Sequence, residues 1–392
     1  MIKIHRIGII SLVAIISLIS WNAVAQVITG AEQPGEWLPL LRGKRIGVVA
    51  NASSVVGRVN TVDTLVASGC EVVKIFSPEH GFRRQVSDGA AVEDHADSVT
   101  GIPVVSLYGK HRKPSQEDLE GIDLMVFDIQ DVGVRFYTYI STLTYVMEAC
   151  AEKGIPLVVF DRPDPNGFYV DGPVLDRRFA SFVGLHPVPV VYGMTIGEYA
   201  LMVNGEGWMK DSLRCNLQVL PLKDWTHHTY IQLDEPPSPN LTTMNAIYLY
   251  PSLCFLEGTD VSIGRGTCSP FEVFGHPEFK GFSFSFTPES IPGMSLHPPH
   301  QGELCRGLDL HDFYEKHPAM FGRINLSWLM MGFINLGSSP AFFTAYFDQL
   351  AGTDALRKQI LSGATEAEIR QSWQEGIENF KTIRQKYLLY DL

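Results

Sequence analysis

Residues 45–54 read RIGVVANASS, an apolar run that ends abruptly in small polar side chains. Similar apolar runs follow at 71–76 (EVVKIF), 103–107 (PVVSL), 123–128 (DLMVFD) and 156–160 (PLVVF). Segments able to form helices lie between them, at 61–68, 114–120 and 141–153. Strands that are apolar on both faces and alternate with helices are typical of a parallel sheet covered on both sides. We therefore predict an α/β fold whose N-terminal domain is a Rossmann-like, doubly wound, mostly parallel sheet.

Polar side chains follow each of these predicted strands. In an open α/β sheet, ligands bind outside the carboxyl ends of the strands, so these side chains indicate one cleft. Polar loops are common without a ligand, but a carboxylate and an arginine at the exit of an apolar strand exceed what solubility requires. The candidate cleft residues from the strand ends are Asn51, Glu79, His80, Tyr108, Asp128, Gln130, Asp131, Asp161 and Arg162.

The pattern changes after about residue 187. Thr195, with Glu198 three residues later, resembles a capping box at the start of a helix over 195–203. PPSPN at 236–240 excludes both a helix and an inner strand. Two further helices are expected, at 341–350 and 364–387.

We place a domain boundary near Thr243. It divides the chain into an N-terminal catalytic domain at 26–243 and a smaller C-terminal α/β domain at 244–392 that closes the cleft.

Residues 1–25 read as a secretory signal peptide. Lys3 and Arg6 precede a nearly continuous apolar run at 7–21, and Ala23-Val24-Ala25 has the small-x-small pattern of a cleavage site. We predict cleavage after Ala25 and a periplasmic or secreted protein with no stable membrane span after cleavage. The alternative is an uncleaved anchor, although the apolar run is short for a membrane helix, which needs about 20 apolar residues.

Composition excludes several classes of protein. Hydrophobic residues make up 45% of the chain, which is typical of a globular protein. The net charge is -12, so nucleic acid is not an expected partner.

Six cysteines have wide spacings without a C-x-x-C pair. A disulfide between Cys254 and Cys268 and buried free thiols are both open interpretations.

Several common catalytic signatures are absent from the sequence. It has no G-x-G-x-x-G, no G-x-x-x-x-G-K-[ST], no G-x-S-x-G and no H-E-x-x-H. We therefore predict neither a dinucleotide nor any other cofactor. His80, Asp94, His95 and Asp97 match no metal-ligand spacing and are interpreted as surface residues, so no metal site is predicted.

Carboxylates and aromatic rings remain as the candidate chemistry. Glu79 lies in FSPEHGF, where two nearby phenylalanines would raise its pKa and suit it as a general acid; the alternative is a surface glutamate in a turn. The run DIQDVGVRFYTY at 128–139 adds Arg135 and Tyr137 beside carboxylates. Asp131 and Arg135 could also form a purely structural pair. Flat rings beside carboxylates and amides suit a sugar, and glycoside hydrolysis requires two carboxyl groups.

The stretch EGTDVSIGRGT at 257–267 is the most distinctive part of the second region. Its glycines would let the backbone approach a ligand closely, and Arg265 between two glycines could bind a carboxylate or phosphate with two hydrogen bonds. The alternative is a glycine-rich turn whose arginine pairs with a neighbouring acid.

The ordered strings FSPEHGF, SLYG, DIQDVGVRFYTYIST, DRPDP, YGMTIGE, PPSPN and EGTDVSIGRGTCSPFE together resemble the exo-β-N-acetylmuramidase family NamZ. The resemblance extends from about residue 43 to 390. It implies a Rossmann-like domain, a smaller C-terminal α/β domain and an active site between them. The implied activity is hydrolytic release of terminal N-acetylmuramic acid from the non-reducing end of peptidoglycan fragments.

The resemblance also implies roles for individual residues. The family's catalytic glutamate falls on Glu79, and its DIQD string falls on Asp128, Gln130 and Asp131, followed by Arg135 and Tyr137. PPSPN adds Ser238 and Asn240 to the expected substrate-binding residues. The chain departs from the family at Asp164, where many members have asparagine, and at Ile263, where a carboxylate is missing.

The resulting hypothesis gives Glu79 the role of proton donor to the leaving oxygen. Asp128 or Glu257 would stabilise the oxocarbenium-like centre or activate water, unless the acetamido oxygen of the substrate replaces that group. Arg265 or Arg135 would hold the lactyl carboxylate of muramic acid. The expected partner is a peptidoglycan-derived oligosaccharide or muropeptide. Alternatives are an exported muropeptide-binding protein without catalysis and, less consistent with the missing motifs, an esterase or amidase.

Overall fold

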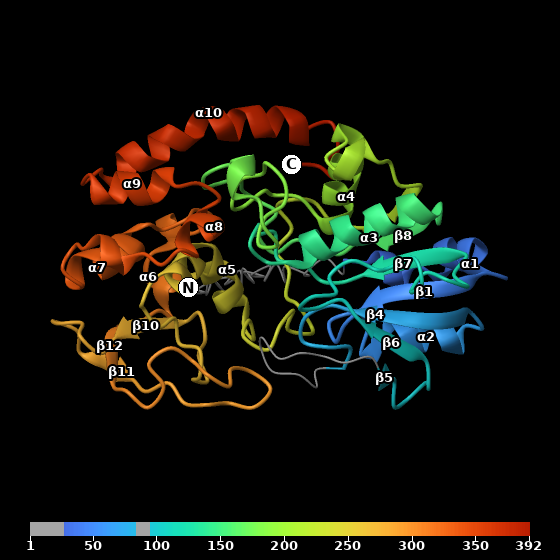
Figure 1. Cartoon of the computed structure of the whole chain (residues 1–392), viewed down its shortest axis with the longest axis horizontal. Coiled ribbons are helices and arrows are strands. Elements are labelled where there is room, and N and C mark those ends of the chain that lie inside the picture. The colour runs from blue at the N-terminus through green and yellow to red at the C-terminus, as the bar shows by residue number, and fades with distance from the viewer. Residues whose placement is uncertain (1–26, 84–94) are drawn as a thin grey trace, which may run out of the picture.

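The structure is a computed structural model that describes residues 27–83 and 95–392. One mixed sheet of seven strands has the order β5-β6-β4-β1-β7-β8-β9 (Figure 1). All neighbouring pairs in it are parallel except β5 with β6. The strands are β1 (Arg45–Ala50), β4 (Glu71–Ser77), β5 (His95–Ala96), β6 (Pro103–Ser106), β7 (Leu124–Asp128), β8 (Leu157–Phe160) and β9 (Leu217–Leu220).

Helices cover both faces of this sheet, because both sets of alternating side chains are apolar. Val48 and Val49 are adjacent in β1 but belong to different buried clusters, one on each face. The cluster that contains Val48 also receives α1 (Pro34–Leu41) and α2 (Thr61–Ala67). The cluster that contains Val49 receives α3 (Tyr139–Lys153) and α4 (Ile196–Glu206). The predicted α/β fold with a mostly parallel sheet is therefore confirmed.

The C-terminal region contains a small antiparallel sheet with the order β10-β12-β11. Its strands are β10 (Val273–His276), β11 (Phe284–Phe286) and β12 (Cys305–Asp309), and a further hairpin in the N-terminal region joins β2 (Val55–Val56) to β3 (Val59–Asn60). The helices of the C-terminal region are α5 (Met244–Leu253), α6 (Phe313–Lys316), α7 (Ser327–Asn335), α8 (Phe347–Ala351), α9 (Ala355–Leu361) and α10 (Glu366–Arg384). The sequence analysis did not identify the small sheet.

Three of the expected helices can be compared directly with the structure. The helix that begins with the capping box at Thr195 is confirmed as α4, with both reciprocal hydrogen bonds to Glu198. The helix expected at 364–387 is α10. The helix expected at 341–350 is wrong, since residues 340–342 form one 3₁₀ turn and α8 begins only at Phe347.

No helix forms at 114–120 in the described chain, contrary to the prediction. The Asp118 carboxylate accepts hydrogen bonds from the backbone nitrogen and the hydroxyl of Ser115, which closes a local turn. Gly121 then takes a left-handed conformation with φ of 76° and ends the turn before a helix can extend.

The main hydrophobic core is continuous across the expected domain boundary. Phe136, which follows β7, contacts Tyr250 in α5 and Phe255, with ring centroids 5.5 and 5.7 Å apart. Figure 1 shows α10 running from α9 back over the N-terminal region towards α4. The C-terminal region is therefore packed firmly against the sheet domain, and the boundary near Thr243 stays a prediction.

All six cysteines lie in the described part of the chain, and each is a free thiol. Cys254 is buried and Cys268 is exposed, so the interpretation as unpaired thiols is the one that the structure supports. Within residues 27–83 and 95–392, no helix combines the length and the apolar character that crossing a bilayer requires.

Candidate active site

One cavity of about 950 Å³ lies where the segments after β4, β6 and β7 meet the C-terminal region. The N-terminal region and the glycine-rich segment of the C-terminal region both contribute to its wall. Eight of the predicted site residues line it: Glu79, His80, Tyr108, Tyr137, Ser238, Asn240, Glu257 and Arg265. Residues 160 or more positions apart in sequence are thus brought into one cleft, as the strand-end argument required.

A sharp turn places Glu79 at this cavity. Glu79 follows β4 within the string SPEHG. His80 and Gly81 then have φ of 72° and 76°, so two successive left-handed residues reverse the chain. A left-handed histidine is strained compared with glycine, and such strain is concentrated at functional sites.

Glu257 provides the second carboxylate of the cavity, at the end of a 3₁₀ turn, η4 (Cys254–Gly258). Its Oε1 accepts a hydrogen bond from Nε of Arg265 at 2.5 Å, and its Oε2 accepts one from Sγ of Cys254 at 3.4 Å. The two charged side chains are 21% and 19% exposed. The arginine therefore orients and compensates the carboxylate while leaving it accessible.

The carboxylates of Glu79 and Glu257 both affect the pKa of the Tyr346 hydroxyl. Burial raises the pKa of Tyr346, and the neighbouring Cys254, Glu257 and Glu79 raise it further. Burial, and then Glu79, likewise raise the pKa of Tyr139. Glu79 and Glu257 therefore face a common part of the cavity in which the tyrosines stay protonated.

Aromatic rings line the same cavity as these carboxylates and form what we call its aromatic floor: Tyr137, Tyr139, Tyr250 and Phe271. Tyr137 lies 4.8 Å from Tyr139 and 5.9 Å from Tyr250, measured between ring centroids. Tyr250 packs edge-on against Phe271 at 4.9 Å, and the Arg265 guanidinium lies 5.2 Å from the centroid of Phe271. A wall of flat rings with two carboxylates provides stacking surfaces and hydrogen-bond acceptors for a sugar ring.

Comparison with known proteins identifies the family. Residues 46–245 match the family model described as exo-β-N-acetylmuramidase NamZ, N-terminal, and residues 248–390 match its C-terminal counterpart. The chain belongs to the NamZ family. It is 38% identical, over 89% of its own length and 88% of the relative's, to the peptidoglycan β-N-acetylmuramidase NamZ of Bacillus subtilis strain 168.

Two crystal structures of DUF1343 family proteins from Bacteroides fragilis NCTC 9343 share the whole architecture. One is 46% identical with a TM-score of 0.86, and the match covers 94% of this chain and 99% of that one. The other is 30% identical with a TM-score of 0.79, and the match covers 94% and 100% of the two chains.

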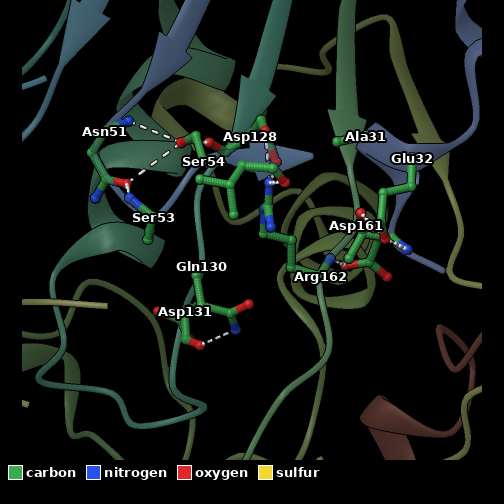
Figure 2. Close-up of polar contacts among 12 residues, drawn as sticks. Ala31, Glu32, Asn51, Ser53, Ser54, Asp128, Gln130, Asp131, Asp161 and Arg162 are labelled. Atoms are coloured by element: carbon green, nitrogen blue, oxygen red, sulfur yellow. Dashed lines mark hydrogen bonds and ion pairs between the residues drawn. The ribbon is translucent and has the colours of Figure 1, made fainter. Parts of the chain in front are cut away.

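Within this NamZ family chain, Asp128 does not line the cleft, contrary to the prediction of a catalytic role. Its carboxylate is fully buried and accepts two hydrogen bonds from Arg162, at 2.6 and 2.9 Å. Figure 2 shows the two side chains facing one another, with Ser54 donating to the backbone oxygen of Asp128. Arg162 also donates to the carbonyl of Val55. This pair joins the ends of β7 and β8 and leaves no carboxylate oxygen open to a substrate in the cleft.

Asp161 also serves the fold. Its carboxylate accepts hydrogen bonds from the hydroxyl of Thr195 at 2.7 Å, from the backbone nitrogen of Gly197 at 2.8 Å and from the hydroxyl of Tyr390 at 2.5 Å. Burial raises its pKa to about 7. The predicted contact of Asp161 with substrate is therefore wrong, since it caps α4 and anchors the C-terminal residues.

Asp131 and Gln130 stabilise the loop after β7 rather than the main cavity. Asp131 accepts hydrogen bonds from Tyr192 and from the backbone nitrogen of Gly133, and burial raises its pKa to about 6. Gln130 donates to the carbonyls of Asp131 and Pro163, each at 2.7 Å. Gln130 and Arg162 line a separate cavity of about 230 Å³, next to the β2–β3 hairpin.

Asn51 is connected to the cleft through Tyr139, which lines the cavity. It donates to the hydroxyl of Tyr139 at 2.8 Å, while its Oδ1 accepts from the backbone nitrogen of Ser53 at 2.9 Å (Figure 2). Asn51 therefore fixes the end of β1 and orients one ring of the aromatic floor.

Arg135 is the clearest correction among the predicted substrate-binding residues. Its guanidinium is fully buried and donates to the carbonyls of Pro173, Val188, Leu350 and Ala351. Burial lowers its pKa to about 9. It therefore joins the two regions of the chain, and it cannot hold a substrate carboxylate.

The glycines at 258–266 also serve a different purpose from the predicted one. A Cβ added at Gly258 would lie 2.5 Å from the backbone of Phe347, and one at Gly266 would lie 2.5 Å from the carbonyl oxygen of Glu289. The backbone approaches the protein itself at these positions. Arg265 pairs with Glu257, which matches the alternative interpretation of a neighbouring acid.

The residues considered as a metal cluster are dispersed. His80 lines the cavity, and Asp97 is buried and paired with Arg83 at 2.6 Å, so neither is the surface residue that was predicted. His95 is exposed in β5, and Asp94 lies outside the described residues.

Donor atoms of Asp260, His276 and His300 lie within 4.8 Å of one another and resemble a metal centre. However, Nδ1 of His276 accepts a hydrogen bond from the backbone nitrogen of Glu278 at 3.1 Å, so a neutral His276 carries its proton on Nε2. That Nε2 faces Asp260 at 3.3 Å. A metal ligand normally donates from its second ring nitrogen, so this arrangement fits a hydrogen-bonded clasp better than a metal site.

Several residues that line the cavity were not identified from the sequence as site residues: Arg112, Phe182, Tyr250, Phe271, His297 and Tyr346. Most lie in segments with no motif, and only the three-dimensional packing brings them together. A signal was available for Arg112, because it follows the SLYG string at the end of a predicted strand.

Proposed function

We propose that this protein is an exported, exo-acting β-N-acetylmuramidase. It hydrolyses the glycosidic bond that joins a terminal N-acetylmuramic acid, at the non-reducing end, to the rest of a peptidoglycan fragment. Its membership of the NamZ family and the activity named for the relative from Bacillus subtilis support this proposal. The observation that carries it in the chain itself is the single cavity that joins Glu79 and Glu257 over a floor of aromatic rings.

In the proposed reaction, Glu79 donates a proton to the glycosidic oxygen as the bond from C1 to that oxygen breaks. Positive charge develops at C1, and a carboxylate on the other side of the ring stabilises it. Glu257 is suited to this role because it lines the cavity and its ion pair with Arg265 fixes the orientation of its carboxylate. Water then adds to C1 and transfers a proton to the Glu79 carboxylate, which restores Glu79 as the acid for the next turnover.

Export is the second part of the proposal. It rests on the basic start, apolar run and small-x-small pattern of residues 1–25. Expression of the full chain in a bacterium, followed by fractionation and mass spectrometry, tests it. A periplasmic or secreted product that begins at Gln26 supports export, and a cytoplasmic product that retains residues 1–25 contradicts it.

The activity is tested with the chain from Gln26 to Leu392 and a chromogenic β-N-acetylmuramide. Glu79→Gln is expected to lower kcat by about 10²- to 10⁴-fold, the usual contribution of a positioned general acid. Glu257→Gln is expected to be similarly impaired. Lys110→Gln is the matched surface control on the neighbouring loop and should keep full activity.

Two outcomes would overturn the proposal. Full activity of Glu79→Gln would remove Glu79 from the mechanism. Tight muropeptide binding by calorimetry, with no release of chromophore by the unaltered chain, would instead indicate the alternative function of a muropeptide-binding protein.

A further inference from the structure

Among the described residues, two guanidinium groups line the cavity, and their partners differ. Arg265 donates to Glu257 at 2.5 Å, so its charge is already compensated by a carboxylate of the site. Arg112, on the loop after β6, forms no ion pair with any carboxylate of residues 27–83 and 95–392. Its charge is therefore available to an anionic group that enters the cavity.

The neighbours of Arg112 explain why it has no acidic partner within residues 27–83 and 95–392. His111 pairs with Asp118 at 2.9 Å, and Lys113 pairs with Glu148 at 3.1 Å and with Glu152 at 2.8 Å. Asp118, Glu148 and Glu152 therefore pair with the residues on either side of Arg112, and neither of those two residues is among the described residues that line the cavity.

Aromatic stacking holds Arg112 in place instead. Its guanidinium lies 4.2 Å from the centroid of the Phe182 ring, and that ring stacks on Tyr145 with centroids 6.1 Å apart and an angle of 13° between planes. Stacking engages the face of a guanidinium and leaves its N–H groups, which lie in the plane, free to donate. Phe182 lines the cavity together with Arg112.

We infer that Arg112 is the residue that recognises the carboxylate of the substrate, and that it replaces Arg135 and Arg265 in the role first expected for them. The inference rests on the proposed function. Muramic acid differs from glucosamine in its lactyl carboxylate, and a planar guanidinium held at the cavity wall can donate two parallel hydrogen bonds to such a group. Arg112 therefore determines specificity, whereas Glu79 and Glu257 carry the chemistry.

The test compares two chromogenic β-N-acetylmuramides, one with a free lactyl carboxylate and one with that carboxylate as its methyl ester. For the unaltered chain, kcat/KM should be higher for the free acid. Arg112→Gln should reduce this preference by about 10- to 100-fold, which is the range for a lost hydrogen bond to a charged group. Arg112→Lys should retain part of the preference, and Lys110→Gln should retain all of it.

Calorimetry with free N-acetylmuramic acid and N-acetylglucosamine gives a readout that does not depend on turnover. Arg112→Gln should weaken binding of the first sugar and leave binding of the second unchanged. If the unaltered chain hydrolyses neither muramide, the proposed function fails, and this binding comparison still decides the role of Arg112. An unchanged preference in Arg112→Gln, or an equal loss for both sugars in a folded variant, would overturn the inference.

Discussion

Asn240 is expected to reduce the stability of the protein while it serves the site. The residue is only 2% exposed and lines the cavity, yet neither Nδ2 nor Oδ1 of its side chain has a hydrogen-bond partner among the described residues. Most buried polar groups in proteins are hydrogen-bonded, and an unpaired one is a reason to expect a ligand. An amide offers a donor and an acceptor side by side, which complements the acetamido group of an N-acetylated sugar.

Replacing Asn240 with leucine removes both unpaired atoms. Burial of an unpaired amide costs about 1 to 3 kcal/mol in protein mutational data, so Asn240→Leu should increase the free energy of unfolding by up to that amount. The same variant should lose about 10-fold or more in kcat/KM on the muramide, since each 1.4 kcal/mol of lost transition-state binding is about tenfold in rate. Urea unfolding and a chromogenic assay measure the two effects on one preparation.

Opposite changes in stability and activity are what the reasoning requires. A leucine variant that is destabilised by more than about 1 kcal/mol would refute it, because the amide would then be well satisfied in the folded protein. Asn204→Leu is the matched control, since that amide donates to and accepts from Cys215 and its loss should destabilise the protein.

Three further predictions concern buried charges. Arg135→Leu should lower the free energy of unfolding by at least about 3 kcal/mol in urea titrations, because four buried carbonyls lose their donor, whereas Arg178→Gln, on the surface, should change it little. Burial raises the pKa of Asp164, so its folded form favours the proton and stability falls as the pH rises above about 4. The gain in melting temperature from Asp164→Asn should therefore grow between pH 4 and pH 8. Hydrogen bonds from Arg83 and Thr100 lower the pKa of Asp97, so the destabilisation caused by Asp97→Asn should be full at neutral pH and decrease as the pH falls below about 4.

Five of the seven strands of the large sheet, β1, β4, β6, β7 and β8, could be predicted because each is a mainly apolar run with mostly buried side chains. Val48 and Val49 in β1 are an example, since each enters a different core cluster. The edge strands β5 and β9 were not predicted, since β5 is exposed and β9 is only partly buried. The strands of the small sheet are only three to five residues long and lie among Gly, Pro and Phe, so no periodicity marks them.

The candidate site could be predicted as a region and only in part as a set of side chains. Glu79 and Glu257 belong to distinctive strings, and both line the cavity. Asp128 and Arg162 were each assigned to the cleft because they lie at strand ends, but at the neighbouring ends of β7 and β8 they form an ion pair with each other. A sequence pattern identifies the edge of the sheet at which a side chain lies, and it does not identify the partner that the side chain will meet.

Hydrogen bonds between the C-terminal helix α10 and the N-terminal region affect how a substrate can enter the cavity. Arg384 in α10 donates to the carbonyl of Gly193 at 2.8 Å, and Arg370 donates to Asp171 at 2.8 Å. Together with the hydroxyl of Tyr390 on Asp161, these contacts fasten the C-terminal region to the sheet domain at widely spaced points. A hinge motion that opens the two regions would have to break all of these hydrogen bonds together. The cavity should therefore be preformed and rigid. Sugars should diffuse into crystals grown without ligand and occupy the cavity without damaging the crystal lattice.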